Sequence, residues 1–350
     1  MSGRKKLFWS LFSMGLAALS IWAVLSQSRN LSLTGIVESL REAEPLWLLA
    51  AIVCTALFVV LEGVALFVLL KGIGYRQSLS HCMLYSTSDI YFSAITPSAT
   101  GGQPASAYFM VKDGVPAGVA AVTLLVNLIL YTVSLIVLGL ISVLFWPGLF
   151  FSLGTVSKIL IAVGAVIQVL LTFLFFVLLG KGPKVFSLAR RFVCFLHSKK
   201  LLYRLEHRLK KLDNAQREYE ECARIMKGKG SLFFHALLWN TLQRGLQMAV
   251  PMCIYLALGG DMKKAGLLFA SQCLVVLGYA PVPIPGAMGV ADYLMLDAFT
   301  CLGFIAVEEA IRLEMISRGL MFYLCVATSG IITLIGYLLL RKKEKGMTRS

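Results

Sequence analysis

The chain of 350 residues is 58% apolar and only 15% charged, with a mean hydropathy of +0.80 and a formal net charge of +15. Soluble globular domains are usually about 45–50% apolar and about 25% charged, so this composition excludes an ordinary soluble protein. The positive charges lie in short loops and tails beside apolar segments. There they indicate membrane topology and attraction to anionic lipid, so nucleic acid is not expected as a partner.

Six apolar segments are long enough to cross a bilayer as helices, which takes about 20 residues. They span residues 7–25, 46–70, 117–145, 159–179, 232–258 and 315–340. The first follows a basic N-terminus as in a signal peptide, but its length predicts an uncleaved membrane helix. We therefore predict an all-α polytopic membrane protein in which residues 1–350 form a single integral membrane domain.

Two further apolar regions, residues 82–115 and 265–305, are interrupted by proline and glycine. The interruptions read TPSATGGQP (96–104) and PVPIPGAMG (281–289). Proline removes a helical hydrogen-bond donor and glycine weakens a helix, so neither region is expected to form one regular span. Ordinary spans with a kink are the alternative.

The distribution of Lys and Arg predicts the orientation, because cytoplasmic loops are enriched in these residues. Residues 181–230 hold fourteen Lys or Arg against five acidic residues, and both termini are basic. We therefore place these three parts on the cytoplasmic side of the cytoplasmic membrane, with loops 26–45 and 307–314 outside. Counting crossings then makes each interrupted region a re-entrant helix pair, and the two pairs point in opposite directions.

This layout is that of an inverted repeat, with halves at residues 46–145 and 232–340. In transporters built from such repeats, interrupted helices in corresponding positions mark the substrate site. The basic linker between the halves, residues 181–230, carries apolar residues at helical spacing. These are Val185, Leu188, Phe192 and Phe195, then Leu202, Leu205, Leu209 and Leu212. The pattern predicts amphipathic helices that lie on an anionic membrane face, or alternatively a connector packed on the bundle.

Charged residues inside apolar helices are costly and usually face a cavity or a partner. In this chain they are Glu62, Asp89, Arg244, Asp292 and Arg318. Both signs occur, so buried ion pairs that lock helices together are the structural alternative. For Arg318, near the end of the last span, reaching to the membrane interface is a further alternative.

The two breaks add polar and backbone groups to this set. Gly101 and Gly102 allow close approach of a ligand to backbone N–H groups, and Pro104 is well placed to begin a half-helix. The N-terminus of such a half-helix attracts phosphate. The predicted lipid-headgroup residues are therefore the five charged residues together with Thr96, Pro97, Thr100, Gly101, Gly102, Gln103, Pro285, Gly286 and Gly289.

Signatures of catalysis are not found in the sequence. The eight cysteines are scattered without a CxxC motif, and the four histidines are dispersed, so we expect no metal site and no cofactor. Nucleotide-binding, HExxH and GxSxG motifs are missing. We therefore assign no catalytic residue and do not expect an enzyme.

The segments ITPSATGGQP (95–104) and PIPGAMGVAD (283–292), with Arg318 and Tyr323, resemble the lysylphosphatidylglycerol synthase transmembrane-region family. The resemblance covers nearly the whole chain and implies a helical bundle that moves aminoacylated phosphatidylglycerol or related lipids between leaflets. The family usually has Glu at the position of Asp292. Its bifunctional members add a cytosolic domain that transfers lysine from lysyl-tRNA, and we expect this chain to lack that domain.

The leading hypothesis is a flippase or scramblase for a phospholipid such as aminoacylated phosphatidylglycerol, or for a related anionic or polyprenyl lipid. A second hypothesis is a membrane component of phosphatidylglycerol lysyltransferase-type lipid metabolism that acts with a separate transferase. A third is a lipid-binding regulatory protein that transports nothing. Membrane phospholipids are the expected partners in each case, and a homo-oligomer is compatible with all three.

Overall fold

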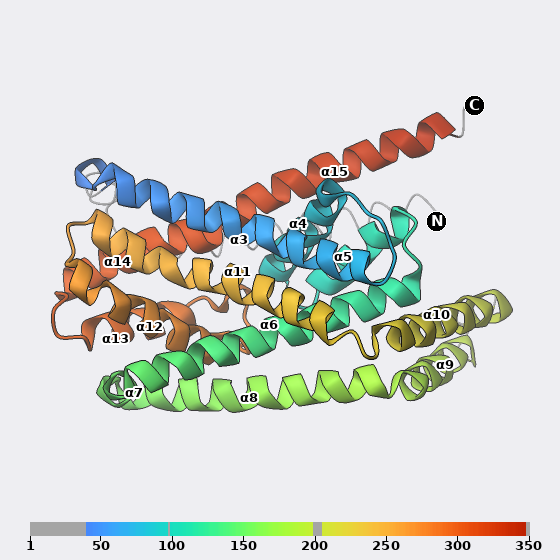
Figure 1. Ribbon diagram of the computed structural model, residues 1–350, viewed down its shortest axis with the longest axis horizontal. Coiled ribbons are helices and arrows are strands. Elements are labelled where there is room, and N and C mark those ends of the chain that lie inside the picture. The colour runs from blue at the N-terminus through green and yellow to red at the C-terminus, as the bar shows by residue number, and fades with distance from the viewer. Residues whose placement is uncertain (1–39, 97–98, 199–204, 348–350) are drawn as a thin grey trace.

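The computed structural model describes residues 40–96, 99–198 and 205–347 (Figure 1). These residues form helices joined by short connections, and no strand occurs among them. The prediction of an all-α protein is thereby confirmed. The predicted first span, residues 7–25, lies outside the described residues, as do Pro97, Lys199 and Lys200.

Four of the described helices are long and apolar enough to cross a membrane. They are Pro45–Gly72 (α3), Ala117–Phe145 (α6), Thr155–Gly180 (α8) and the continuous stretch Val307–Leu340. They include the spans predicted at 46–70, 117–145, 159–179 and 315–340, so the chain is a membrane protein. The span predicted at 232–258 coincides with the 28-residue helix Gly230–Ala257 (α11). This helix is more polar than the four spans above, since it contains the amides Asn240 and Gln243, which are buried.

The segment 307–314, predicted as an outer loop, is helical. It forms the first two turns of Val307–Arg318 (α14), which continues through the π-helix Gly319–Leu324 (η4) into Cys325–Met347 (α15). Glu309 caps the start of α14, because its Oε2 accepts a hydrogen bond from the N–H of Ala306 at 3.3 Å. A segment rich in Glu and Ala with such a cap favours a helix over a loop.

Each interrupted region consists of a long helix, a break and a helix of 11 residues. The first comprises Leu79–Ile95 (α4) and Gly102–Lys112 (α5), and the second comprises Met262–Tyr279 (α12), Pro285–Ala287 (η3) and Val290–Thr300 (α13). An 11-residue helix rises only about 16 Å, roughly half the thickness of the hydrocarbon core. Neither short helix is therefore long enough to span a bilayer.

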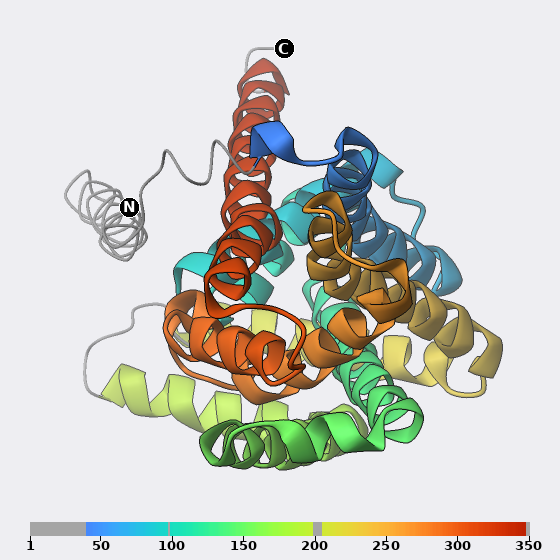
Figure 2. The same ribbon diagram turned by 90° about the vertical axis from the view of Figure 1, so that its left-hand side faces the viewer.

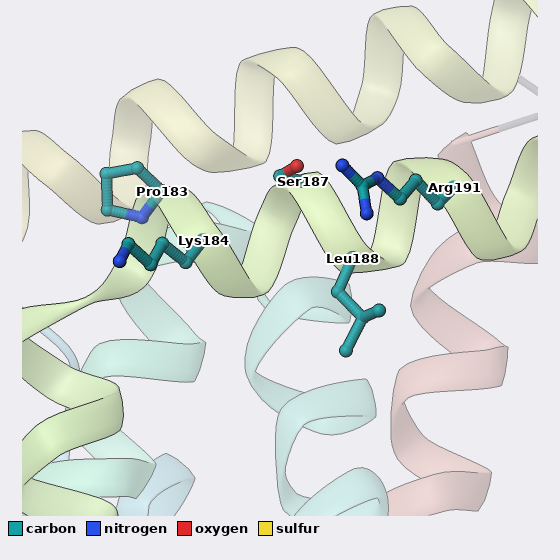
Figure 3. A pocket seen from close by; sticks show the side chains of 5 residues that line it. All are labelled: Pro183, Lys184, Ser187, Leu188 and Arg191. Carbon is teal, nitrogen blue, oxygen red and sulfur yellow. The ribbon is translucent and has the colours of Figure 1, made fainter.

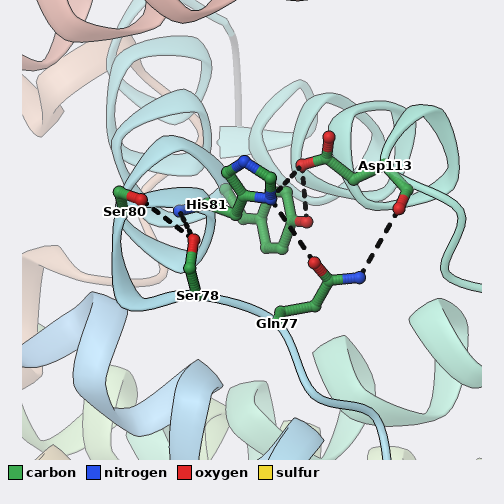
Figure 4. Close-up of polar contacts among 6 residues, drawn as sticks. Gln77, Ser78, Ser80, His81 and Asp113 are labelled. Atoms are coloured by element: carbon green, nitrogen blue, oxygen red, sulfur yellow. Dashed lines mark hydrogen bonds and ion pairs between the residues drawn. The ribbon is translucent and has the colours of Figure 1, made fainter.

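The two ends of the first interrupted region are tied together by a polar cluster (Figure 4). Asp113, directly after α5, accepts a hydrogen bond at 2.7 Å from the hydroxyl of Tyr85 on α4. Its Oδ2 also lies 3.3 Å from Nδ1 of His81. The second region closes in a similar way, since Nζ of Lys264 at the start of α12 lies 4.5 Å from the ring centre of Phe304, beyond α13. In both regions, the end therefore lies close to the beginning.

The helices pack into one elongated bundle with two main hydrophobic clusters. In Figure 1, α3 and α11 run side by side, and their extensive contact joins the two halves of the chain. Leu268, Leu294 and Phe299 are fully buried in the cluster that includes α12 and α13. Leu66 and Tyr85 belong to the second cluster, around α3 and α4. The apolar parts of both interrupted regions are therefore core.

The short helix Pro147–Ser152 (α7) connects α6 to α8. After α8, the linker between the halves forms two helices, Gly182–Ser198 (α9) and Leu205–Met226 (α10). Helix α10 packs on α6, where Oε2 of Glu218 accepts a hydrogen bond from the N–H of Gly118 at 3.0 Å. The inner face of α10 carries the buried side chains of Tyr219, Cys222 and Met226. The second amphipathic segment thus packs on the bundle at these residues, as the alternative of a packed connector predicts. That the segment also lies on the membrane stays a prediction.

Candidate functional site

A cavity of about 580 Å³ lies between the two breaks. The first break contributes Ala99 and Gln103 to its wall, and the second contributes Ile284 and Gly286. The remaining wall comes from α3, α4, α6, α8, α11, α12, α14, η4 and α15, with one residue of α13. The volume falls within the range of about 300–1,000 Å³ that is typical of small-molecule pockets.

The structure brings part of the predicted headgroup set into this cavity. The predicted residues that line it are Glu62, Asp89, Gln103, Arg244, Gly286 and Arg318. The predicted residues that lie in or beside the breaks, outside the cavity wall, are Thr96, Thr100, Gly101, Gly102, Pro285, Gly289 and Asp292. Charged residues from four different helices therefore converge, whereas most of the glycines do not face the cavity.

Asp89 of α4 is held by two neutral donors. The amide of Gln103 donates to Oδ2 at 2.7 Å, and the hydroxyl of Ser93 donates to Oδ1 at 3.0 Å. Within the described residues, no Lys or Arg nitrogen lies within 4 Å of this carboxylate. Gln103 therefore holds a carboxylate at the cavity wall and links α4 to α5, a role the sequence did not predict.

Glu62 of α3 is the second carboxylate on the wall. It is buried, and its Oε2 accepts a hydrogen bond from Nε2 of Gln243 at 2.9 Å, which joins α3 to α11. Like Asp89, it has no cationic side chain within 4 Å in the described part of the chain. The cavity thus presents two carboxylates that are hydrogen-bonded but not ion-paired.

Arg244 of α11 is the cation that faces them. Its guanidinium lies over the rings of Tyr131 and Phe58, at 3.8 and 5.0 Å from the ring centres. Nη1 donates to Oε1 of Gln247 at 2.9 Å, and no carboxylate oxygen of the described residues lies within 4 Å. Stacking on aromatic faces stabilises the charge and leaves the edge of the planar guanidinium for an anion.

Arg318 is held in a different way, by two acidic residues, of which Glu314 is buried and Asp292 is partly exposed. Its Nε lies 2.8 Å from Oδ1 of Asp292 and 4.0 Å from Oε1 of Glu314, and Nη2 donates to the carbonyl of Gly286 at 3.2 Å. Asp292 also accepts a hydrogen bond from the N–H of Gly289 at 2.8 Å, which caps α13. Asp292 is therefore not open to a headgroup as predicted, because Arg318 and the helix start occupy it. The Arg318 side chain is buried among these groups, with 8% of its surface exposed.

The glycines of the breaks serve packing more than open anion binding. The N–H of Gly101 donates to the hydroxyl of Thr96 at 2.9 Å, and α5 begins at Gly102 instead of Pro104. A Cβ at Gly102 would meet the side chains of Asp89 and Ser93. The predicted approach of a ligand to the backbone at these two glycines is therefore wrong, because a side chain or the neighbouring helix already occupies that space.

One comparison with known proteins identifies the family of this chain. A family model described as "Lysylphosphatidylglycerol synthase TM region" matches residues 10–329. The chain belongs to this family. No curated protein and no solved structure matches it. Membership gives this lysylphosphatidylglycerol synthase-type protein a membrane role in lipid handling.

Sequence reasoning missed several residues of this family member that line the cavity or hold the residues that line it. Phe58, Tyr131 and Gln243 hold the charged residues, and the amide of Asn240 donates to Oδ1 of Asn127 at 3.1 Å across α6 and α11. The available signal was weak. Isolated amides and tyrosines in otherwise apolar helices point to an interior face, but they do not name the partner helix.

Proposed function

We propose that this protein is a flippase or scramblase that passes a phospholipid headgroup through the cavity between the two breaks while the acyl chains stay in the bilayer. The observation that carries the proposal is one cavity whose wall combines the carboxylates of Glu62 and Asp89 with Arg244, which no carboxylate oxygen of the described residues approaches within 4 Å. Charges at membrane depth are costly and are retained at sites of transport.

The arrangement of charges favours a headgroup that contains both a phosphate and an amine. Arg244 offers a planar pair of donors to phosphate oxygens, and Asp89 and Glu62 attract an ammonium group. Aminoacylated phosphatidylglycerol, the lipid implied by the family, carries both groups. A purely anionic headgroup would leave the two carboxylates unmatched, so we expect it to be a poorer substrate.

The apolar part of the wall fits the rest of the lipid. Leu171 and Phe175 of α8 face the cavity together with Phe322 of η4 and Val326 of α15. A wall with a few charged groups among apolar side chains accommodates a glycerol backbone and the first acyl carbons beside the headgroup. This composition favours a lipid over a small polar solute.

We also propose that the two interrupted regions are oppositely oriented re-entrant pairs and that the halves at 46–145 and 232–340 form an inverted repeat. Three observations support this arrangement: the equal lengths of α5 and α13, the closeness of the two ends of each region, and the capped starts of α4 and α12. Ser78 accepts from the N–H of His81, and Asp261 accepts from the N–H of Lys263. The second half repeats the plan of the first.

The proposed topology puts the linker and both termini in the cytoplasm. Cys194 on α9 is exposed, so it serves as a native reporter of the linker. We expect a membrane-impermeant thiol reagent to leave Cys194 unlabelled in intact cells and to label it after permeabilisation. Val307→Cys in a Cys194→Ser background is the matched external control, since Val307 is exposed at the start of α14. Labelling of Cys194 in intact cells would show that the linker lies outside, and the proposed topology would be wrong.

The role of Asp89 predicts a change in substrate preference. We expect Asp89→Asn to lower the translocation of lysylphosphatidylglycerol about tenfold in proteoliposomes, because a charge-assisted hydrogen bond to the amine contributes about 1.5–3 kcal/mol. Translocation of phosphatidylglycerol itself should change little. Glu308→Gln, at an exposed acid on α14, is the control and should leave both rates unchanged. Equal losses for the two lipids would show that Asp89 does not contact the amine.

A further inference from the structure

Helix α9 carries an apolar face that the other described helices leave exposed. Val185, Leu188, Phe192 and Phe195 are 42%, 68%, 59% and 56% exposed. At about 100° per residue, these four positions fall within a sector of roughly 80° around the helix axis. We call them the α9 apolar face. So large a cluster of exposed apolar side chains marks a surface that binds something.

The opposite side of α9 is held by α10. The ring of Phe186 packs edge-on against Tyr219 at 5.5 Å between centres, and Arg190 pairs with Asp213. The hydroxyl of Tyr219 donates to the carbonyl of Leu179 at 3.2 Å, at the end of α8. Burial raises the pKa of Tyr219, which keeps the hydroxyl a neutral donor. The α9 apolar face is thus fixed on the side that α10 leaves open.

The direction of α9 is that of a helix lying in the membrane surface. It follows α8 after a turn at Lys181, and the two views together show it running across the long axis along which α8 extends (Figures 1 and 2). Phe173 and Phe176, in the last turns of α8, are each 66% exposed, as expected for a lipid-facing span. The α9 apolar face therefore continues a lipid-facing surface at the end of a span.

Basic residues border this face and line a shallow hollow of about 420 Å³ (Figure 3). Lys184, Ser187 and Arg191 lie on successive turns of α9 and line it together with Pro183 and Leu188. Lys184, Ser187 and Arg191 follow one another along the helix and supply two cations and a hydroxyl, groups that bind lipid phosphates. Basic residues beside an apolar face are typical of helices that lie in the interface of an anionic leaflet.

We propose that α9 is an in-plane anchor. Its apolar face enters the boundary between headgroups and acyl chains, and Lys184, Ser187 and Arg191 bind the phosphate of an anionic phospholipid there. This surface site is separate from the cavity and serves attachment, not translocation. Continuity with the lipid-facing part of α8 and the positive border both favour a membrane over a soluble protein or a second copy of the chain as the occupant.

The test uses the full-length protein in nanodiscs that contain phosphatidylcholine with or without phosphatidylglycerol. A polarity-sensitive fluorophore is placed at Leu188→Cys in a Cys194→Ser background. The control is the same fluorophore on native Cys194, which is exposed and lies about 140° around the helix axis from the centre of the α9 apolar face. We expect the label at 188 to be blue-shifted and quenched by doxyl lipids, and the label at 194 to remain in water.

The second part of the test asks whether the basic residues prefer an anionic headgroup. Doxyl-labelled phosphatidylglycerol should quench the label at 188 more strongly than the phosphatidylcholine analogue does. Replacing Lys184 and Arg191 by glutamine should lower that selectivity by about fivefold per charge at most. Lys263→Gln, at a basic residue at the start of α12, should leave it unchanged. A label at 188 that stays in water, or one that becomes buried only as protein concentration rises, would overturn the proposal.

Discussion

Replacing Arg244 by alanine is expected to lower lipid translocation at least tenfold. The guanidinium is the one cation of the described cavity wall that no carboxylate oxygen approaches within 4 Å, and it lies 3.8 Å from the ring centre of Tyr131. A charge-assisted contact to phosphate contributes about 1.5–3 kcal/mol, which corresponds to roughly 10- to 100-fold in rate or affinity. Translocation of fluorescent phospholipid in proteoliposomes measures the effect.

Two variants separate binding from folding in this experiment. Arg244→Lys keeps the charge but loses the planar pair of donors, so we expect partial activity. Arg312→Ala removes an exposed arginine of α14 that does not line the cavity, so it should translocate as the wild type does. Monodispersity and thermal stability in detergent report on the fold. Normal translocation by a well-folded Arg244→Ala protein would exclude Arg244 from the transport site.

Replacing Arg318 by alanine is expected to have the largest effect on stability. The change leaves Asp292 and Glu314 without their cation in a site where the Arg318 side chain is only 8% exposed. Breaking a fully buried pair from one side costs about 3–5 kcal/mol, because the remaining charge is uncompensated. Since the Asp292 side chain is 22% exposed, we expect a loss at the lower end of this range. The hydrogen bond to the carbonyl of Gly286 is lost as well, so the second break loses its tie to α14. Thermal unfolding in detergent measures the loss.

A double-mutant cycle shows whether loss of the ion pair between Arg318 and Asp292 accounts for the loss of stability in Arg318→Ala. Asp292→Ala and Arg318→Ala together should destabilise the protein by less than the sum of the single changes, with a coupling energy of about 0.5–3 kcal/mol. Arg312→Ala on the exposed side of the same helix should stay within about 0.5 kcal/mol of the wild type. Additive losses in the cycle would mean that Arg318 stabilises α14 by packing alone.

Much of the fold follows from local features of the sequence. The apolar lengths predicted α3, α6 and α8, and the Pro and Gly runs predicted both breaks, because these effects depend on neighbouring residues only. The helix start at Val307 does not follow from the sequence pattern, because the charge of the Glu-rich stretch after it favours an outer loop. The capping hydrogen bond of Glu309 shows that the same acids start a helix.

The site was harder to predict, for a physical reason. The charged residues were identified because charge in an apolar helix is costly wherever it points. Their partners were not, because lipid is as apolar as the protein core and the sequence does not show which side of a membrane helix faces inward. The pairing of Arg318 with Asp292, and the stacking of Arg244 on Tyr131, depend on how distant helices are rotated against one another.

If a lipid headgroup passes through the cavity between the breaks, a bulky group attached inside that cavity should block lipid translocation. Ile284 lines the cavity and is 42% exposed, so Ile284→Cys gives a site for a bulky thiol reagent. We expect wild-type proteoliposomes to move lysylphosphatidylglycerol faster than protein-free vesicles do. We also expect the reagent to stop movement in Ile284→Cys but not in Val307→Cys or the parent chain. Undiminished movement in fully modified Ile284→Cys would contradict passage through the cavity.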